Sequence, residues 1–235
     1  MRVSMRPRIR QSTASIRAID TKLPTDLSIP DKAQGVVVFG DGIGGGRQTP
    51  SHRRVAEVLN AGGLATVLAD LFEDHAAVSG RDNGIPDSDL DLLELEQRVV
   101  TVTDWIAMQP GLREMRLGYF GAGLGAAAAL IAAAKRPEVV KAVVLSGARL
   151  DLAESFLCEI AAPSLFIVGA DDPALISLHR SSIAQLPGET LARLEVIEGS
   201  GGDPLQNEKA VNRVAALARS WFQRFLPREH YAAAG

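Results

Sequence analysis

Three glycines at alternate positions, Gly121, Gly123 and Gly125, follow an apolar run and precede an alanine-rich segment. In the related pattern G-x-S-x-G, the central residue is a serine or cysteine on a sharp strand-to-helix turn, and its nucleophilic atom is exposed above the sheet. Here the central residue is Gly123, so the frame of such a turn is present and the attacking atom is absent. The segment therefore predicts the backbone of a covalent catalyst without the group that forms the covalent bond.

A second glycine-rich segment, residues 40–46, also follows a short apolar run. We expect the amides of Ile43 and Leu124 to point at one spot above Gly123, because an oxyanion hole is built in this way and helix N-termini favour anions. Arg47 would add a positive charge. The alternative for this segment is a merely flexible turn. The residues expected to line a site for a small carbonyl or carboxylate ligand are Asp41, Gly42, Ile43, Arg47, Gly123 and Leu124.

Residues 40–45 also match G-x-G-x-x-G, a pattern that binds dinucleotides when it follows a strand and opens a helix. In that fingerprint the helix begins inside the motif, and an acidic residue follows about 20 residues later. Here the better helix start is Thr49-Pro50-Ser51, and Asp70 comes too late. The sequence therefore favours an oxyanion-type loop, and no cofactor is predicted.

The elements that would position these residues alternate between strand-like and helix-like segments from about residue 35 onward, which indicates a mostly parallel sheet with helices on both faces. Short β-branched and apolar runs predict strands at 36–39, 65–68, 115–120, 142–145, 165–168 and 194–197. Helical patterns cover 51–61, 91–108, 124–135, 152–160, 175–186 and 208–225. Residues 16–19 and 26–29 predict an antiparallel lead-in, and the polar residues 73–89 predict a loop over the carboxyl edge of the sheet.

A chain of 235 residues with 46% hydrophobic residues fits one α/β domain, which we place at residues 17–226. Residues 1–16 carry several arginines and no acid, as a transit peptide would, but they lack the apolar core of a secretory signal. We expect residues 1–16 to be a flexible basic tail and residues 227–235 to be a C-terminal tail.

The net charge of −3 provides no basic field for nucleic acid or anionic lipid. A single cysteine, Cys158, is compatible with a reducing cytosol, and no run approaches the roughly 20 apolar residues of a membrane span. The composition predicts a cytoplasmic protein, a monomer or homodimer, with a small-molecule ligand and with neither nucleic acid nor membrane as a partner.

The order of these features resembles the dienelactone-hydrolase-like branch of the α/β-hydrolase superfamily. The resemblance spans about residue 17 to Leu226, and it rests on residues 121–125, on the glycine loop after 36–39, on Gly169-Ala170-Asp171-Asp172, and on a final strand, loop and helix. It implies a three-layer α/β-hydrolase fold with an eight-stranded, mostly parallel sheet. It also implies a Ser or Cys nucleophile at the elbow, an acid after the seventh strand and a His after the eighth.

Residue by residue, the resemblance places Gly123 at the nucleophile position, Gly202 at the histidine position and Asp172 at the acid position. A His-Gly pair common in such hydrolases is replaced by Asp41-Gly42. Because a catalytic triad works as one device, we expect a catalytically degenerate domain that retains a ligand pocket. The alternative is an active hydrolase with a rearranged mechanism, in which Asp41 or Asp172 activates water. The histidines, none of which falls in the expected loop, are His52, His75, His179 and His230.

Other polar residues are also expected near the carboxyl edge of the sheet, where open α/β sheets keep their ligand sites. No His or Cys accompanies them, and their spacing is not that of a metal-binding loop. We therefore interpret the acidic residues as solvated side chains rather than as a site for a metal ion or an amine. Ser146 has no visible base and is interpreted as a structural turn residue. The acidic residues of this group are Asp41, Asp171, Asp172 and Asp203.

Overall fold

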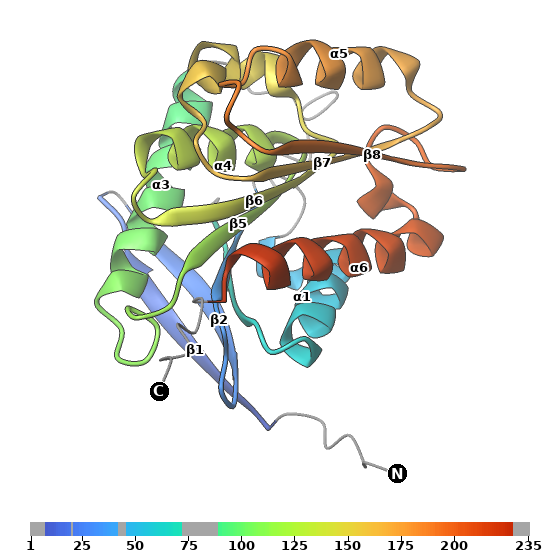
Figure 1. Ribbon diagram of the computed structural model, residues 1–235. Helices are drawn as coiled ribbons and strands as arrows, with labels where there is room; N and C mark the ends of the chain where they lie inside the picture. The colour runs from blue at the N-terminus through green and yellow to red at the C-terminus, as the bar shows by residue number, and fades with distance from the viewer. Residues whose placement is uncertain (1–7, 20, 42–45, 72–88, 228–235) are drawn as a thin grey trace, which may run out of the picture.

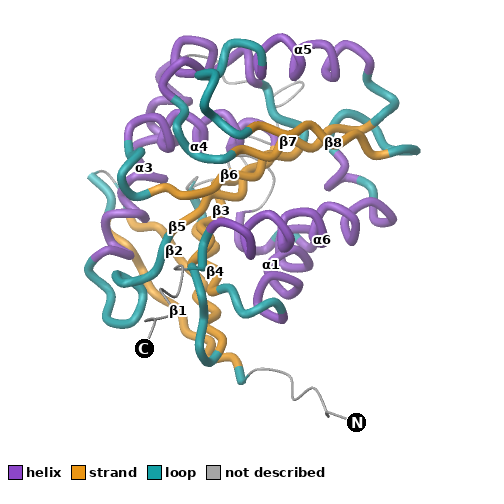
Figure 2. Tube along the Cα trace, in the orientation of Figure 1, coloured by secondary structure: helices purple, strands orange, loops and turns teal. Residues whose placement is uncertain are grey.

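The computed structural model describes residues 8–19, 21–41, 46–71 and 89–227. Its centre is an eight-stranded sheet in the order β1-β2-β4-β3-β5-β6-β7-β8 (Figures 1 and 2). The pairs β1–β2 and β2–β4 are antiparallel, and all other neighbours are parallel. The eight-stranded, mostly parallel sheet predicted from the sequence is therefore confirmed. The strands are β1 (Ile9–Arg17), β2 (Lys22–Pro30), β3 (Val36–Asp41), β4 (Ala65–Ala69), β5 (Leu117–Ala122), β6 (Val140–Ser146), β7 (Ser164–Gly169) and β8 (Ala192–Ile197).

Helices cover both faces of the sheet. Two of them, α1 and α6, pack side by side on one face, and α3, α4 and α5 lie on the opposite face (Figure 1). The helices are α1 (Pro50–Ala61), α3 (Asp89–Ala107), α4 (Gly123–Lys135), α5 (Pro173–Ile183) and α6 (Glu208–Phe225), with shorter 3-10 helices η1 (Gly46–Gln48), η3 (Leu150–Glu159) and η4 (Pro204–Gln206).

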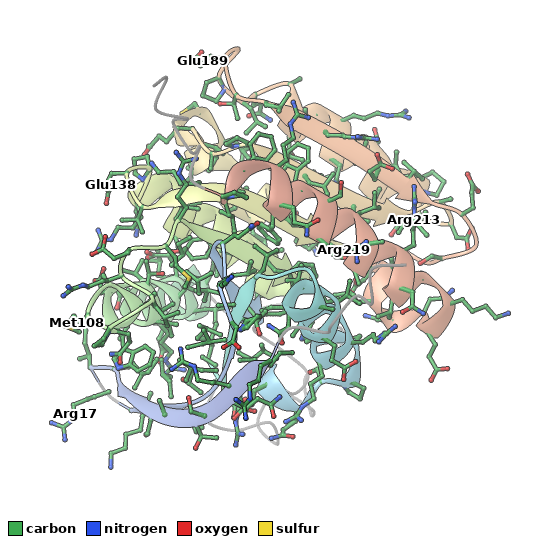
Figure 3. The ribbon with its side chains drawn as sticks, turned by 60° about the horizontal axis from the view of Figure 1, so that its bottom comes forward. Arg17, Met108, Glu138, Glu189, Arg213 and Arg219 are labelled. Atoms are coloured by element: carbon green, nitrogen blue, oxygen red, sulfur yellow. The ribbon has the colours of Figure 1, made fainter. Side chains whose placement is uncertain are left out.

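The amphipathic helix α6 shows how residue spacing selects the buried face. Its apolar residues recur every three or four positions and pack into the cluster between α1, α6 and the sheet. Arg213 and Arg219 lie on its exposed outer surface (Figure 3). The opposite case is α4, whose residues 124–134 are all buried, because this helix lies against the sheet and is covered in turn by α3 and η3.

Two predicted boundaries differ from the structure. Residues 9–16, which we predicted to be part of a flexible tail, form strand β1, and each of its residues pairs with β2. The polar composition misled the prediction because most of β1 is exposed, with Ile16 buried near its end. The segment 152–160, predicted to be helical, forms the 3-10 helix η3. Residues 73–88 of the loop predicted at 73–89 and the tail beyond Pro227 lie outside the described residues, and Asp89 begins α3.

None of the helices in the described part of the chain is long and apolar enough to cross a membrane.

A buried hydrogen-bond pair joins α3 to the central strand β5. The Thr103 hydroxyl donates to Val99 O at 3.0 Å, and the Tyr119 hydroxyl lies 2.7 Å from the same Thr103 oxygen. Because the Thr103 hydrogen is used on Val99, Tyr119 is the donor of the second bond. Both side chains are buried, and desolvation raises the pKa of Tyr119.

This pair predicts an asymmetric response to mutation. Tyr119→Phe should cost about 1 kcal/mol, since Thr103 keeps its bond to Val99. Thr103→Val should cost about 2–3 kcal/mol, because it leaves a buried Tyr119 hydroxyl without an acceptor. The double variant should be more stable than Thr103→Val alone. Urea denaturation of the four proteins checks this order, and costs that simply add would contradict the bonding described.

Candidate functional site

The turn between β5 and α4 keeps the backbone geometry of a nucleophile elbow. Ala122 is extended, and Gly123 then adopts a left-handed conformation with φ of +53°. Gly123 is partly exposed. Apart from its own helix and chain neighbours, no heavy atom of the described residues lies within 4 Å of where its Cβ would be. The position that holds the nucleophile in related elbows is therefore both strained for a side chain and open.

Gly121 serves packing rather than chemistry. A Cβ on Gly121 would lie 2.6 Å from Ala126 Cα, and one on Gly40 would lie 3.1 Å from Ala129 Cβ. These two glycines allow α4 to lie directly on β5 and β3. The close approach fixes where α4 begins and hence where Gly123 points.

The first turn of α4 receives no side-chain cap from its own N-cap residue. Its N-cap, Ala122, makes no capping hydrogen bond, and no acidic residue lies in the first turn. The amides of this turn are thus left at the positive end of the helix dipole, which favours an anion or a carbonyl oxygen. Leu124, expected to donate its amide there, has its side chain packed in the core.

The partner loop of the expected oxyanion hole is described only at its start. Asp41 is the last residue of β3, and its backbone lies next to Ala122 in the sheet register. Gly42 and Ile43 lie outside the described residues, so the convergence of the Ile43 and Leu124 amides stays a prediction.

The acid and histidine positions lie side by side. Asp172 Oδ1 accepts a hydrogen bond from the Leu175 amide at 2.9 Å and caps α5. Its Oδ2 would lie 2.7 Å from a Cβ placed on Gly202. The loops after β7 and β8 are joined by backbone bonds from Gly169 to Gly202 O and from Asp171 to Ser200 O. The structure thus brings together the two positions that the resemblance assigned to acid and base, with only the acid side chain present.

Ser146 is held as a structural residue at the carboxyl end of β6. It is fully buried, lies beside Ala122 in the register, and donates to Asp203 Oδ1 at 3.1 Å. The same oxygen accepts the Leu205 amide at 3.0 Å and so caps η4. With its hydroxyl buried, Ser146 is not exposed to a substrate as an elbow nucleophile would be.

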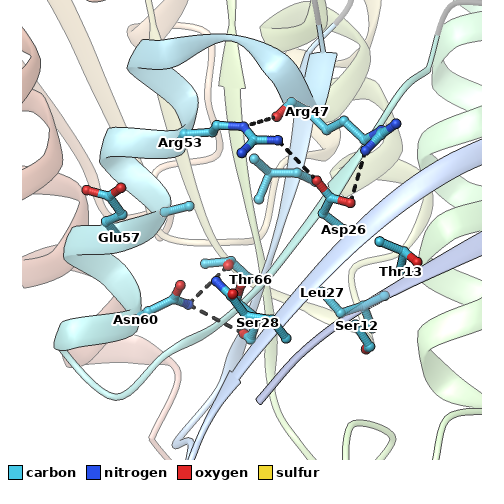
Figure 4. A pocket seen from close by; sticks show the side chains of 13 residues that line it. Ser12, Thr13, Asp26, Leu27, Ser28, Arg47, Arg53, Glu57, Asn60 and Thr66 are labelled. Carbon is cyan, nitrogen blue, oxygen red and sulfur yellow. Dashed lines mark hydrogen bonds and ion pairs between the residues drawn. The ribbon is translucent and has the colours of Figure 1, made fainter. Parts of the chain in front are cut away.

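Arg47 lies away from the elbow. Its Nη1 contacts Asp26 Oδ1 at 3.1 Å (Figure 4). Its Nε contacts Asp70 Oδ2 at 2.8 Å, and its amide donates to Asp70 Oδ1. The hydrogen bond that the Arg47 side chain donates to Asp70 is the main cause of a raised Arg47 pKa. The guanidinium predicted to serve the ligand site is therefore used to tie η1 to β2 and to the end of β4.

The two histidines in the described chain are packed in helices. His52 in α1 meets the rings of Phe39 and Phe120 edge-on. His179 in α5 is fully buried, with Nε2 2.9 Å from Ala148 O, and desolvation lowers its pKa. His75 and His230 lie outside the described residues.

The described carboxylates at this edge have separate structural roles. Asp171 is exposed, while Asp172 and Asp203 each cap a different helix. Within the described ranges, no group of three or more His, Cys, Asp or Glu side chains is placed to hold a metal ion.

The elbow glycines predict different mutational costs. Gly121→Ala should cost about 3 kcal/mol, because the new methyl group meets backbone atoms of Ala126. Gly123→Ala should cost only about 1 kcal/mol, since the space is open and the left-handed backbone is the only penalty. Gly111→Ala is the matched control, because Gly111 also has a positive φ and open space around its Cβ position. Guanidinium denaturation checks the order, and equal costs at 121 and 123 would contradict the packing described.

Comparisons with known proteins agree with this geometry. The model of the dienelactone hydrolase family matches residues 23–198. A dienelactone hydrolase from Anabaena variabilis ATCC 29413 is 39% identical with a TM-score of 0.83, over 93% of this chain and 99% of its own. Est1E from Butyrivibrio proteoclasticus has a TM-score of 0.73 at 15% identity, over 90% of this chain and 98% of its own, which supports the fold alone.

Relatives from two strains of Mycobacterium tuberculosis are 37% identical over 216 residues. They are provisionally named phosphoribosyl transferases, and the matched region is 92% of this chain but 47% of their length. The chain thus spans about half of these relatives. Given the family match, the sheet order and the elbow at Gly123, the chain belongs to the dienelactone hydrolase family.

Proposed function

We propose that this protein is a non-hydrolytic member of its family that binds a small carbonyl or carboxylate compound at the elbow. The proposal rests on the backbone conformation and the residue type at position 123. The elbow backbone, with its left-handed φ and the open space above it, is kept while the nucleophile is absent.

The absence of hydrolysis follows from how a triad works. Nucleophile, base and acid act as a unit, and the loss of one removes most of the rate enhancement. Here positions 123 and 202 are both glycine, and Asp172 caps α5. Ser146 is buried on Asp203, and the histidines of the described chain are packed elsewhere. No pair of described side chains therefore takes over the roles of nucleophile and base.

Ligand binding is favoured by what remains. The uncapped first turn of α4 offers amide donors, and the open volume at Gly123 lets a ligand oxygen approach the backbone. These donors suit the oxygen of a carbonyl or carboxylate, the group that the family's elbow handles during catalysis. The transferase name of the mycobacterial relatives is not extended to this chain, which spans only about half of them.

The second candidate is a hydrolase that activates water through Asp172. It is favoured by one observation, namely that Asp172 is partly exposed and that its Oδ2 faces the empty histidine position. Without a nucleophile or a described base nearby, we rank this mechanism below ligand binding.

Restoring the missing residues tests the proposal. The parent should show no saturable turnover of p-nitrophenyl acetate or of a dienelactone, and no labelling by a fluorophosphonate. Gly123→Ser with Gly202→His should raise the rate of ester hydrolysis by a factor of about 10² or more. This factor is the lower end of the rate gain that general acid–base catalysis typically gives. Each single change should remain near background. Asp172 must rotate to admit the new side chain, so the double variant should also lose about 1 kcal/mol of capping stability.

The matched control places the histidine one residue away. Gly123→Ser with Gly201→His has the same composition, and a Cβ at position 201 meets no described atom within 4 Å, unlike one at position 202. It should stay inactive, because the imidazole is displaced from Asp172. Turnover by the pure parent that disappears in Asp172→Ala would contradict the proposal and support the water-activating hydrolase.

A further inference from the structure

A polar cavity of about 460 Å³ lies between α1 and the outer strands β1, β2 and β4 (Figure 4). Its volume falls in the range of about 300–1,000 Å³ that small-molecule sites occupy. None of the residues of the elbow or of the acid and histidine positions lines it. The cavity is thus a separate feature from the family's site.

One wall of the cavity consists mainly of polar side chains, and the register of the strands places them beside one another. Gln11 pairs with Ser28, which pairs with Thr66 on the next strand, and Thr13 pairs with Asp26. Because paired residues share a face of the sheet, these groups form two adjacent rows that face α1. A sheet face that packs against a helix is normally apolar. Apart from Leu68, which pairs with Asp26 and also lines the cavity, these rows present hydroxyl, amide and carboxylate groups.

The opposite wall is α1, where Asn60 is held in one orientation. It is 5% exposed, and its Nδ2 donates to Leu64 O at 2.9 Å and to Thr66 Oγ1 at 3.0 Å, with a longer contact of 3.4 Å to Ser28 O (Figure 4). Both amide hydrogens are thereby used, and no described residue donates to Asn60 Oδ1. Since Asn60 lines the cavity, this oxygen is left as a fixed acceptor for a ligand hydroxyl.

The charges of the lining balance one another. Arg53 contacts Asp26 at 3.4 Å and donates to the Arg47 carbonyl, and Arg47 is paired with Asp26 and Asp70. Glu57 adds a second carboxylate to the lining. Two guanidinium groups therefore meet two carboxylates, and the arginines are already paired. Such a lining gives no net attraction to a phosphate or other anion.

We propose that this cavity binds a neutral polyhydroxylated compound of monosaccharide size. Adjacent hydroxyls of such a ligand both donate and accept, which matches rows of Ser, Thr, Asn and Gln groups that can do the same. The site is independent of the elbow and of the function proposed for it.

Sugar titrations, together with tryptophan substitutions that fill the cavity from its exposed edge, test the proposal. D-glucose, D-ribose, D-arabinose and inorganic phosphate are titrated against the full chain by NMR. At least one sugar should bind saturably to the parent, and phosphate should bind more weakly or not at all. Thr13→Trp should weaken sugar binding at least tenfold. Gln11→Trp, on the same face of β1, gives a second blocked variant, and both positions are exposed, so folding should be kept.

The matched control is Ser15→Trp, an exposed position on the same strand and face that does not line the cavity. It should bind as the parent does, and excess acetate, a probe for the elbow, should not displace the sugar. The proposal is overturned if none of the three sugars saturates, if Thr13→Trp and Gln11→Trp bind as tightly as Ser15→Trp, or if phosphate binds more tightly than the sugars.

Discussion

The close contact between α4 and the two central strands is the constraint on which the rest of the site depends. Gly121 and Gly40 have no side chain, so the alanine-rich helix lies against β5 and β3 at backbone distance. The helix can begin there only if the chain turns sharply between Ala122 and Leu124, and a left-handed Gly123 makes that turn. The elbow is therefore held by packing that does not require a nucleophile. A glycine at position 123 is therefore compatible with an intact frame.

Backbone contacts and helix caps also hold the positions that the resemblance assigns to the acid and the histidine. The loops after β7 and β8 are fastened to each other by backbone hydrogen bonds, which need no particular side chain. Asp172 is kept in place by its role as the cap of α5, and Asp203 by its bonds to Ser146 and to the start of η4. Each carboxylate thus contributes to helix stability, on the order of 1 kcal/mol for a cap. Such roles would keep these residues in place without any catalytic task.

The sequence predicted the parts of this molecule that depend on local spacing. The glycine spacing at 121–125 located the elbow, and Thr49-Pro50-Ser51 located the start of α1, because both signals lie within a few residues. Strand β1 was missed because an edge strand exposed over most of its length lacks an apolar pattern. The partners of Arg47 lie 21 and 23 residues away, at Asp26 and Asp70, and no local rule connects them. The cavity beside α1 depends on the register of three strands, which appears only after folding.

If the elbow binds a ligand oxygen, as we propose, the amides at the start of α4 must contact it. The backbone amide resonances of Leu124 and Gly125 can be followed by NMR during titration with acetate and with a neutral ester. We expect saturable shifts that are largest at these amides, with little change at Gly188, a loop glycine that also has open space around it. Shifts that rise linearly without saturation, or that centre on another part of the chain, would show that the frame has been kept for its packing alone.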